Sequence, residues 1–237
     1  MMKSDSREYK SALLVGASGL VGGHCLRFLL EEPSYAAVIA LVRRPLPVIH
    51  DKLIQQIVDF DELESLGQCP PVDDVFCCLG TTIRKAGTQD AFRKVDFDYP
   101  VKIAALTEHC GAAQFLLVSS LGADPHSCVF YSRVKGEVEE AIRKISYTTI
   151  NIFRPSLLLG ERTEHRTGEK AGTCIMSGLN HVLVGPLKKY RAIQARDVAR
   201  AMLSTAQMHF CGVNIFESRR IQEIADKQSY VNAGTVG

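Results

Sequence analysis

The sequence has no long hydrophobic run, and no stretch approaches the roughly 20 apolar residues that a membrane-spanning helix needs. Residues 1–10 are polar and lack the apolar stretch of a secretory signal peptide. The net charge is only +2, whereas a nucleic-acid-binding face needs a clustered basic patch. These absences predict a cytoplasmic protein with no integral membrane segment and no nucleic-acid partner.

Paired cysteines are also absent, although the chain has eight cysteines. Cys77 and Cys78 are adjacent inside an apolar run, and the other six are scattered. No two cysteines form a C-x-x-C pair, and no cluster has the spacing of a zinc site. We therefore expect reduced thiols and no metal.

What the sequence does contain is an alternation of short apolar runs with longer amphipathic segments. The runs are continuously apolar, which is typical of strands buried on both faces of a parallel sheet. Repeated strand–helix–strand units predict an α/β fold with a doubly wound, Rossmann-like parallel sheet. The six expected strands are residues 12–15, 37–42, 53–58, 75–79, 115–118 and 148–153.

The length of 237 residues suits one domain over residues 1–237. The periodicity predicts helices after Leu20, over residues 91–110 with entry at Thr88, over 131–145, and over 198–208 with Asp197 as cap. Residues 156–195 and 210–237 are expected to form a small substrate-side part of that domain. We find no internal repeat and no low-complexity linker.

A glycine-rich turn follows the first expected strand. Gly16, Gly19 and Gly22 are spaced as G-x-x-G-x-x-G at a strand–helix junction. A pyrophosphate must approach the backbone N–H groups at a helix N-terminus, where a Cβ in the turn would block it. The last glycine allows close helix–sheet packing. The motif in this context predicts dinucleotide binding.

The end of the second expected strand indicates which dinucleotide binds. NAD-binding proteins carry an acidic residue there for the ribose hydroxyls. This chain has Arg43 and Arg44 instead. Guanidiniums form bidentate, charge-assisted bonds to phosphate, so the pair predicts NADP(H), whose ribose carries a 2′-phosphate. The alternative is a solvated arginine pair on a loop.

Ligands of doubly wound sheets bind beyond the carboxyl ends of the strands. Leu79 and Gly80 end the fourth expected strand, so they are candidates to pass along the adenosine and ribose. The alternative is a turn that only terminates the strand.

Tyr131 and Lys135 form the expected reactive pair. Spaced at i and i+4, they lie one turn apart on the same helical face. A phenol is a poor base at neutral pH, and a nearby ammonium favours phenolate. Ser119 and Ser120 end the preceding strand, and one of these hydroxyls is expected to hold a substrate carbonyl oxygen while Tyr131 transfers a proton. We take Ser120 as the candidate, with Ser119 still open.

These motifs together resemble the short-chain dehydrogenase/reductase superfamily. More closely, residues 12–208 resemble the atypical branch typified by the Tat-interacting oxidoreductase-like protein and its bacterial relatives. The stretches that carry the resemblance are residues 16–19 (Gly-Ala-Ser-Gly), 43–44, 77–82 (Cys-Cys-Leu-Gly-Thr-Thr), 85–87, 95–99, 119–120, 122–124, 131, 134–139, 153–155, and 166 with 168–169.

The resemblance implies contacts beyond those given by the motifs. Ser18, Leu20 and Val21 would join the glycines around the pyrophosphate. Leu79, Gly80, Tyr131 and Lys135 would line the nicotinamide half, and Leu158 and Arg166 would be further cofactor contacts. Asp96 stands where many superfamily members have asparagine, so the resemblance does not give its role.

The leading hypothesis is therefore an NADPH-dependent oxidoreductase that transfers hydride to or from a small carbonyl or alcohol substrate, whose identity the sequence does not give. One alternative is a non-catalytic NADP(H) redox sensor that regulates a protein partner. Another is an NAD-dependent nucleotide-sugar epimerase, which the arginine pair disfavours. Two-fold symmetry is the default for oligomers, so any assembly is expected to be a homodimer.

Overall fold

A computed structural model describes residues 9–63, 71–160, 191–208 and 210–234. Its main sheet has seven parallel strands in the order β3-β2-β1-β4-β5-β6-β9. This order is doubly wound, because the chain moves outward in one direction from β1 and in the other from β4. The predicted fold class is confirmed. The strands are β1 (Lys10–Val15), β2 (Tyr35–Val42), β3 (Leu53–Ile57), β4 (Asp74–Cys77), β5 (Gln114–Val118), β6 (Thr149–Arg154) and β9 (Gly212–Glu217).

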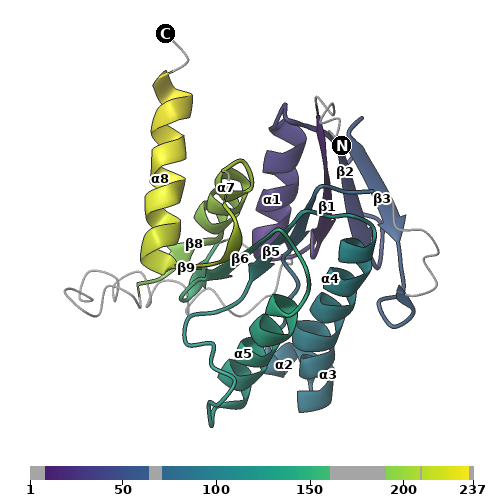
Figure 1. Ribbon diagram of the computed structural model, residues 1–237, viewed down its shortest axis with the longest axis vertical. Coiled ribbons are helices and arrows are strands. Elements are labelled where there is room, and N and C mark those ends of the chain that lie inside the picture. The colour runs from purple at the N-terminus through teal and green to yellow at the C-terminus, as the bar shows by residue number, and fades with distance from the viewer. Residues whose placement is uncertain (1–8, 64–70, 161–190, 209, 235–237) are drawn as a thin grey trace, which may run out of the picture.

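Helices cover both faces of the sheet (Figure 1). One face packs α1 (Leu20–Glu31), α7 (Ala195–Ala206) and α8 (Ser218–Gly234) into one apolar core. The other packs α4 (Tyr99–His109) and α5 (Phe130–Arg143) into a second core. The strands between the two cores are buried throughout β4 and β5 and over most of β1, β2 and β6, as their apolar runs predict.

The helical segment before α4 is interrupted by a wider turn. The short helix α2 (Ile83–Ala86) precedes α3 (Gln89–Arg93), and the π-helical turn η2 (Lys94–Asp98) connects α3 to α4. Thr88 caps α3 as predicted, because its hydroxyl accepts the N–H of Ala91. A π turn inserts one extra residue into a helix and is frequent at functional sites.

The C-terminal part departs from the expectation in two ways. Gly212–Glu217 is a seventh strand of the main sheet, β9, next to β6. Helix α7 begins at Ala195 with Gln194 as its cap, so the prediction of Asp197 as the cap is wrong. Asp197 lies inside the first turn, where its charge favours the positive end of the helix dipole. The assignment of residues 156–195 and 210–237 to a substrate-side part stays a prediction.

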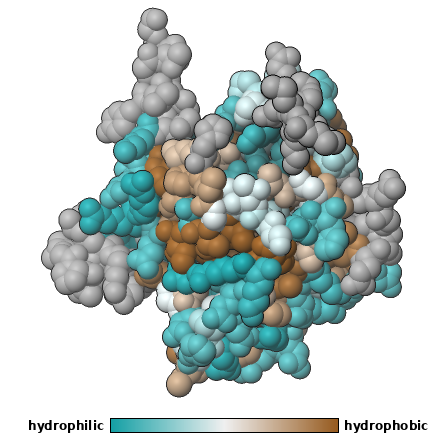
Figure 2. Space-filling model, in the orientation of Figure 1, coloured by the Kyte–Doolittle hydropathy of each residue, from teal (hydrophilic) through white to brown (hydrophobic). Residues whose placement is uncertain are grey.

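A second, two-stranded sheet joins β7 (Leu158–Leu159) to β8 (Ile193–Gln194). The main sheet ends at β9, where Val213 and Ile215 are exposed. Figure 2 shows apolar surface over the strands between α5 and the pair α7–α8. Strand β9 is therefore less covered than the central strands of the sheet, whose carboxyl ends form the predicted site.

Candidate functional site at the carboxyl edge of the sheet

The turn between β1 and α1 has a geometry that only glycine supports. Gly16 has a φ of +82°, and a Cβ placed on it would lie 2.5 Å from the carbonyl oxygen of Cys78 at the end of β4. A Cβ on Gly22 would collide with the carbonyl group of Gly16. The N–H of Gly19 donates to the Gly16 carbonyl at 2.8 Å and closes the turn. The glycines therefore bring α1 against the turn and the turn against β4.

The N-terminus of α1 is open to an anion. Gly19 is the cap residue and makes no side-chain cap, so the first-turn N–H groups, including those of Leu20 and Val21, have no partner within the helix. Ser18 and Gly19 are exposed beside them. These backbone groups and the positive end of the helix dipole fit a pyrophosphate. The six predicted contacts, residues 16, 18, 19, 20, 21 and 22, lie in this turn and the first turn of α1.

The two predicted phosphate-binding arginines follow β2 directly. Because β2 is parallel to β1 and pairs with it, Arg43 and Arg44 lie at the same edge of the sheet as the glycine turn. Both are exposed. Burial and the neighbouring Asp61 raise the pKa of Tyr99 to about 12. The positive charge of Arg43 acts on Tyr99 in the opposite direction and lowers that pKa. Arg43 therefore acts electrostatically on the first residue of α4.

Leu79 and Gly80 continue from β4 on the other side of the glycine turn. A Cβ on Gly80 would lie 3.5 Å from Oδ1 of Asp96 and 3.8 Å from Nζ of Lys135. The strand end therefore brings the backbone next to the predicted reactive lysine, although α5 is more than 50 residues further along the chain.

Tyr131 and Lys135 lie one turn apart in the first half of α5. The ring of Tyr131 packs against Phe92 of α3 at a centroid distance of 5.5 Å. Lys135 is only 4% exposed, and its Nζ lies 2.7 Å from Oδ1 of Asp96. Burial is the largest single influence and lowers the pKa of Lys135, but the interactions with Asp96, followed by that with Tyr131, together outweigh burial, so the pKa is raised. Lys135 is therefore an ammonium held in a buried ion pair.

The hydroxyls of the two serines have different surroundings. The Ser119 hydroxyl donates to Oε1 of Glu139 at 2.6 Å, inside the protein. Glu139 is also bound by Arg154, whose Nη2 lies 2.6 Å from Oε2. The Ser120 hydroxyl has no hydrogen-bond partner among the described residues. The two hydroxyls therefore differ in their partners, and the choice of Ser120 as the substrate-facing serine stays a prediction.

Asp96 is the residue of this site whose role the sequence did not give. It is 1% exposed and lies in η2, and its Oδ2 accepts the N–H of Thr81 at 2.8 Å. The available signal was an aspartate at a position where many superfamily members have asparagine, but its partner Lys135 is 39 residues away in sequence.

The remaining predicted contacts lie further along the chain. Leu158 is in β7, and Gly160 just after that strand approaches the side chain of Leu20 at the start of α1. The end of β7 is therefore close to the glycine turn. Arg166 lies outside the described residues.

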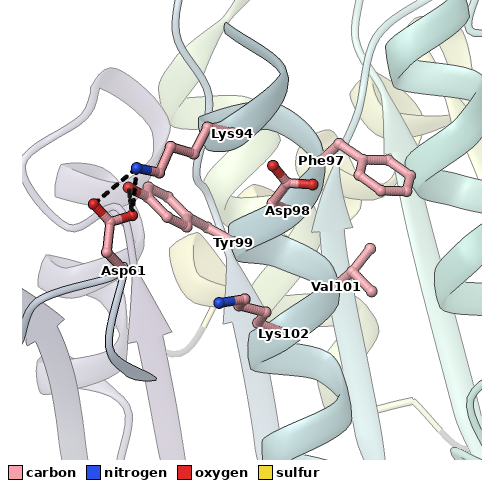
Figure 3. Close-up of a pocket in the computed structure, with 7 residues that line it drawn as sticks. All are labelled: Asp61, Lys94, Phe97, Asp98, Tyr99, Val101 and Lys102. Carbon is pink, nitrogen blue, oxygen red and sulfur yellow. Dashed lines mark hydrogen bonds and ion pairs between the residues drawn. The ribbon is translucent and has the colours of Figure 1, made fainter. Parts of the chain in front are cut away.

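A cavity of about 240 Å³ lies at the first turn of α4, next to but distinct from the reactive residues (Figure 3). Asp61 accepts hydrogen bonds there from Lys94 Nζ at 2.8 Å and from the Tyr99 hydroxyl at 2.7 Å. Phe97 and Val101 point away from that cluster. These bonds fasten the segment after β3 to η2 and α4. The lining includes none of the predicted site residues.

Taken together, a glycine turn at a helix N-terminus, flanked by strand ends and by the helix that carries Tyr131 and Lys135, defines a Rossmann-like nucleotide-binding protein. The sequence profile described as "NAD dependent epimerase/dehydratase family" matches residues 12–216. The chain belongs to this family.

The relatives place the chain in an atypical, HTATIP2-like part of the short-chain dehydrogenase/reductase superfamily. It is 40% identical to "Protein HTATIP2" of Rattus norvegicus over 164 residues, which cover 68% of this chain and 67% of that protein. It is 30% identical to "Protein FMP52, mitochondrial" of Coccidioides immitis over 229 residues, covering 90% and 92%. These relatives are eukaryotic, so the expected bacterial-type affiliation is not supported.

Solved structures with a similar fold include a UDP-N-acetylglucosamine 4-epimerase from Methanobrevibacter ruminantium. Its TM-score is 0.67 at 14% identity, covering 94% of this chain and 83% of that one. An ADP-L-glycero-D-manno-heptose-6-epimerase from Helicobacter pylori has a TM-score of 0.65 at 14% identity, covering 95% and 85%. At this identity the likeness establishes the fold.

The comparisons overturn one expectation about location. Fungal relatives, including that of Saccharomyces cerevisiae at 36% identity, are named as mitochondrial proteins. The prediction of a cytoplasmic protein is therefore contradicted. Among the helices of the described residues, none has the length and apolar character to cross a membrane.

Proposed function

We propose that the protein is an NADP(H)-dependent oxidoreductase that reduces a small carbonyl substrate or oxidises the corresponding alcohol. The observation that carries the proposal is the meeting of three elements at one sheet edge. The glycine turn touches the end of β4 at Cys78, and Gly80, two residues on, lies beside Lys135 of α5. A dinucleotide on the turn would thus extend toward the Tyr131–Lys135 helix.

The extra phosphate of NADP(H) is assigned to Arg43 and Arg44. Both side chains are exposed at the end of β2, where NAD-binding proteins carry a carboxylate. A guanidinium offers a fork of donors that matches a phosphate, and the two positive charges oppose its dianionic charge. Gly16, Ser18, Gly19, Leu20, Val21 and Gly22 are assigned to the pyrophosphate, and Leu79, Gly80, Leu158 and Arg166 to the rest of the cofactor.

The chemistry is assigned to Tyr131, Ser120 and Lys135. A bound nicotinamide would supply or accept the hydride. In reduction, Tyr131 donates its phenolic proton to the carbonyl oxygen, and the Ser120 hydroxyl donates a hydrogen bond to the same oxygen. Lys135 holds a positive charge one helical turn from Tyr131 and would hydrogen-bond the nicotinamide ribose of a bound cofactor. Ser120 fits this role because its hydroxyl is otherwise unpaired.

The test is the loss of NADPH absorbance with a panel of aldehydes and ketones. Removing a general acid costs about 10²–10⁴ in rate, so Tyr131→Phe should reduce kcat by that range. Ser120→Ala should reduce kcat by about 10² or more, as for other donors to a reacting oxygen. Ser119→Ala is the matched control, because its hydroxyl serves Glu139, and it should change stability more than turnover. Absence of NADPH oxidation with every substrate would refute the assignment.

The family and the solved structures favour one second candidate, an NAD-dependent epimerase of sugar nucleotides. A structure with a TM-score of 0.67 to this chain is described in complex with UDP-glucose and NAD. An epimerase returns its hydride to the substrate and releases no reduced cofactor. Tightly retained NAD in the purified protein, with no net NADPH consumption, would favour this candidate. A redox sensor would instead bind NADPH and NADP⁺ with unequal affinity and show no turnover.

A further inference from the structure

Asp96 is a buried carboxylate next to the reactive pair, and the proposed function gives it no task. Its two oxygens have different partners: Oδ2 accepts the N–H of Thr81, and Oδ1 lies 2.7 Å from Nζ of Lys135. The carboxylate therefore connects η2, the segment after β4 and α5.

We propose that Asp96 is a positioning residue that holds the Lys135 ammonium beside Gly80 and offsets its charge, so that Tyr131 acts as a proton donor for carbonyl reduction. The proposal rests on the proposed function for the role of Tyr131. It goes further by assigning a direction to the proton transfer and a residue that sets it.

Because Asp96 and Lys135 are both buried, the carboxylate offsets the charge of the ammonium strongly. The side chain of Asp96 is fully buried and that of Lys135 is 6% exposed, so little water screens the two charges. A Cβ on Gly80 would lie 3.5 Å from Oδ1 of Asp96 and 3.8 Å from Nζ of Lys135, which is ordinary van der Waals contact. The segment after β4 therefore lies directly beside both members of the ion pair.

Other ionisable groups near Lys135 are neutral or already paired. Cys77 of β4 faces the pair, and burial raises the pKa of its thiol to about 12, so it stays neutral. Glu139, one turn further along α5, is bound by Ser119 and Arg154. Glu137 pairs with Arg93 of α3. Among the residues that the structure describes, Asp96 is the carboxylate paired with Lys135.

The offset of the Lys135 charge by Asp96 decides whether Tyr131 donates a proton to a carbonyl or accepts one from an alcohol. A lone ammonium one turn away would favour phenolate, which accepts a proton and suits alcohol oxidation. An ammonium with a carboxylate at 2.7 Å presents little net charge to the phenol. In the reduction, the carbonyl carbon gains a hydride, its oxygen gains the proton of Tyr131, and solvent restores that proton. The carbonyl becomes an alcohol and the nicotinamide is oxidised.

Ultraviolet difference titration of tyrosinate in the cofactor-free full chain tests the proposal without turnover. The chain has seven tyrosines, so the signal of Tyr131 is isolated by subtracting the Tyr131→Phe variant. Asp96→Asn, measured against Asp96→Asn/Tyr131→Phe, should move the Tyr131 titration about one pH unit lower, as expected for removing a charge that offsets a nearby ammonium. Asp98→Asn, two residues along η2, is the matched control and should leave it in place. Coinciding titrations for Asp96→Asn and the parent protein overturn the proposal.

A second pair of variants covers the case in which Asp96→Asn does not fold, since it leaves a buried ammonium without its partner. Asp96→Asn/Lys135→Met removes both charges and restores neutrality. If Asp96 offsets Lys135, Tyr131 of this double variant titrates within a few tenths of a pH unit of the parent protein. If the ammonium acts alone, the double variant titrates well above the parent, as Lys135→Met does, and the proposal is overturned.

Turnover separates this inference from the proposed function. In a protein that reduces carbonyls, Asp96→Asn should move the alkaline decline of kcat to lower pH, and Asp96→Glu should restore part of the parent profile. A shifted titration with no NADPH oxidation would refute the oxidoreductase while the charge compensation stands. Carbonyl reduction with coinciding titrations would refute the compensation alone.

Discussion

The hydroxyl of Ser119 donates a 2.6 Å hydrogen bond to the carboxylate of Glu139, and this bond joins the end of β5 to the middle of α5. Arg154, at the end of β6, binds the same carboxylate with both Nε and Nη2. Glu139 is 1% exposed. The cluster fixes α5 against two strand ends and thereby sets Tyr131 relative to Ser120.

Glu139→Gln should destabilise the protein by about 3 kcal/mol, the lower end of the range for breaking a buried ion pair, because Arg154 is 20% exposed and keeps some water. The measurement is urea unfolding. Glu140→Gln, at the neighbouring exposed position, should change the free energy of unfolding by less than about 0.5 kcal/mol. Equal effects of the two substitutions would show that the cluster has no special role.

Adjacent glycines in α1 should respond in opposite ways to alanine. Gly22→Ala places a Cβ against the Gly16 carbonyl and should cost about 1–3 kcal/mol and weaken NADPH binding. Gly23→Ala meets only an ordinary contact of 3.5 Å and should stabilise the helix by up to about 1 kcal/mol. Thermal unfolding and NADPH titration of both variants check this. A Gly22→Ala protein as stable and as tightly binding as Gly23→Ala would refute the packing argument.

Arg43→Asp should weaken NADPH binding by about 10- to 100-fold, since charge-assisted hydrogen bonds contribute about 1.5–3 kcal/mol. NADH affinity should change little, because NADH lacks the 2′-phosphate. Arg27→Asp makes the same charge change on the exposed side of α1 and is the control. If Arg43→Asp changes both affinities equally, the arginine does not hold the phosphate.

His24 should make stability fall as the pH drops below about 6.5. Burial, followed by the charges of Arg27 and Arg196, lowers the pKa of His24 from its ordinary value of 6.5. Below that pH the unfolded chain takes up a proton that the folded chain resists, so protonation favours unfolding. Urea unfolding at pH 7.5 and 5.5 should show a smaller loss of stability in His24→Asn. An equal loss of stability in His24→Asn and in the parent protein would contradict this prediction.

The central strands and one edge strand of the sheet were predictable from the sequence, and the other edge strand was not. The six predicted runs became β1 to β6. Strands β4 and β5 are buried throughout, because strands covered on both faces have no polar side to alternate with. The edge strand β3 contains Gln55 and Gln56 and is only partly buried. Strand β9 was missed. Its sequence, Gly-Val-Asn-Ile-Phe-Glu, begins with a glycine and mixes apolar with polar residues, as expected at an edge of the sheet, so it resembles a loop. Residues 91–110 were predicted as one helix. The structure divides this range among α3, the π turn η2 and α4, and the π turn left no periodic signal in the sequence.

The candidate site was predictable where local motifs define it. The glycine turn and the i, i+4 spacing of Tyr131 and Lys135 are local patterns. The choice between Ser119 and Ser120 depends on Glu139, and the state of Lys135 depends on Asp96, both of which are long-range contacts. The spacing of residues along a single sequence does not reveal those long-range contacts.

The most direct test of the account is calorimetric titration of the purified full chain with NADPH and with NADH. The account predicts one NADPH bound per chain, at least about tenfold more tightly than NADH, which corresponds to 1.4 kcal/mol or more from the arginine–phosphate contacts. The absence of NADPH binding would contradict it.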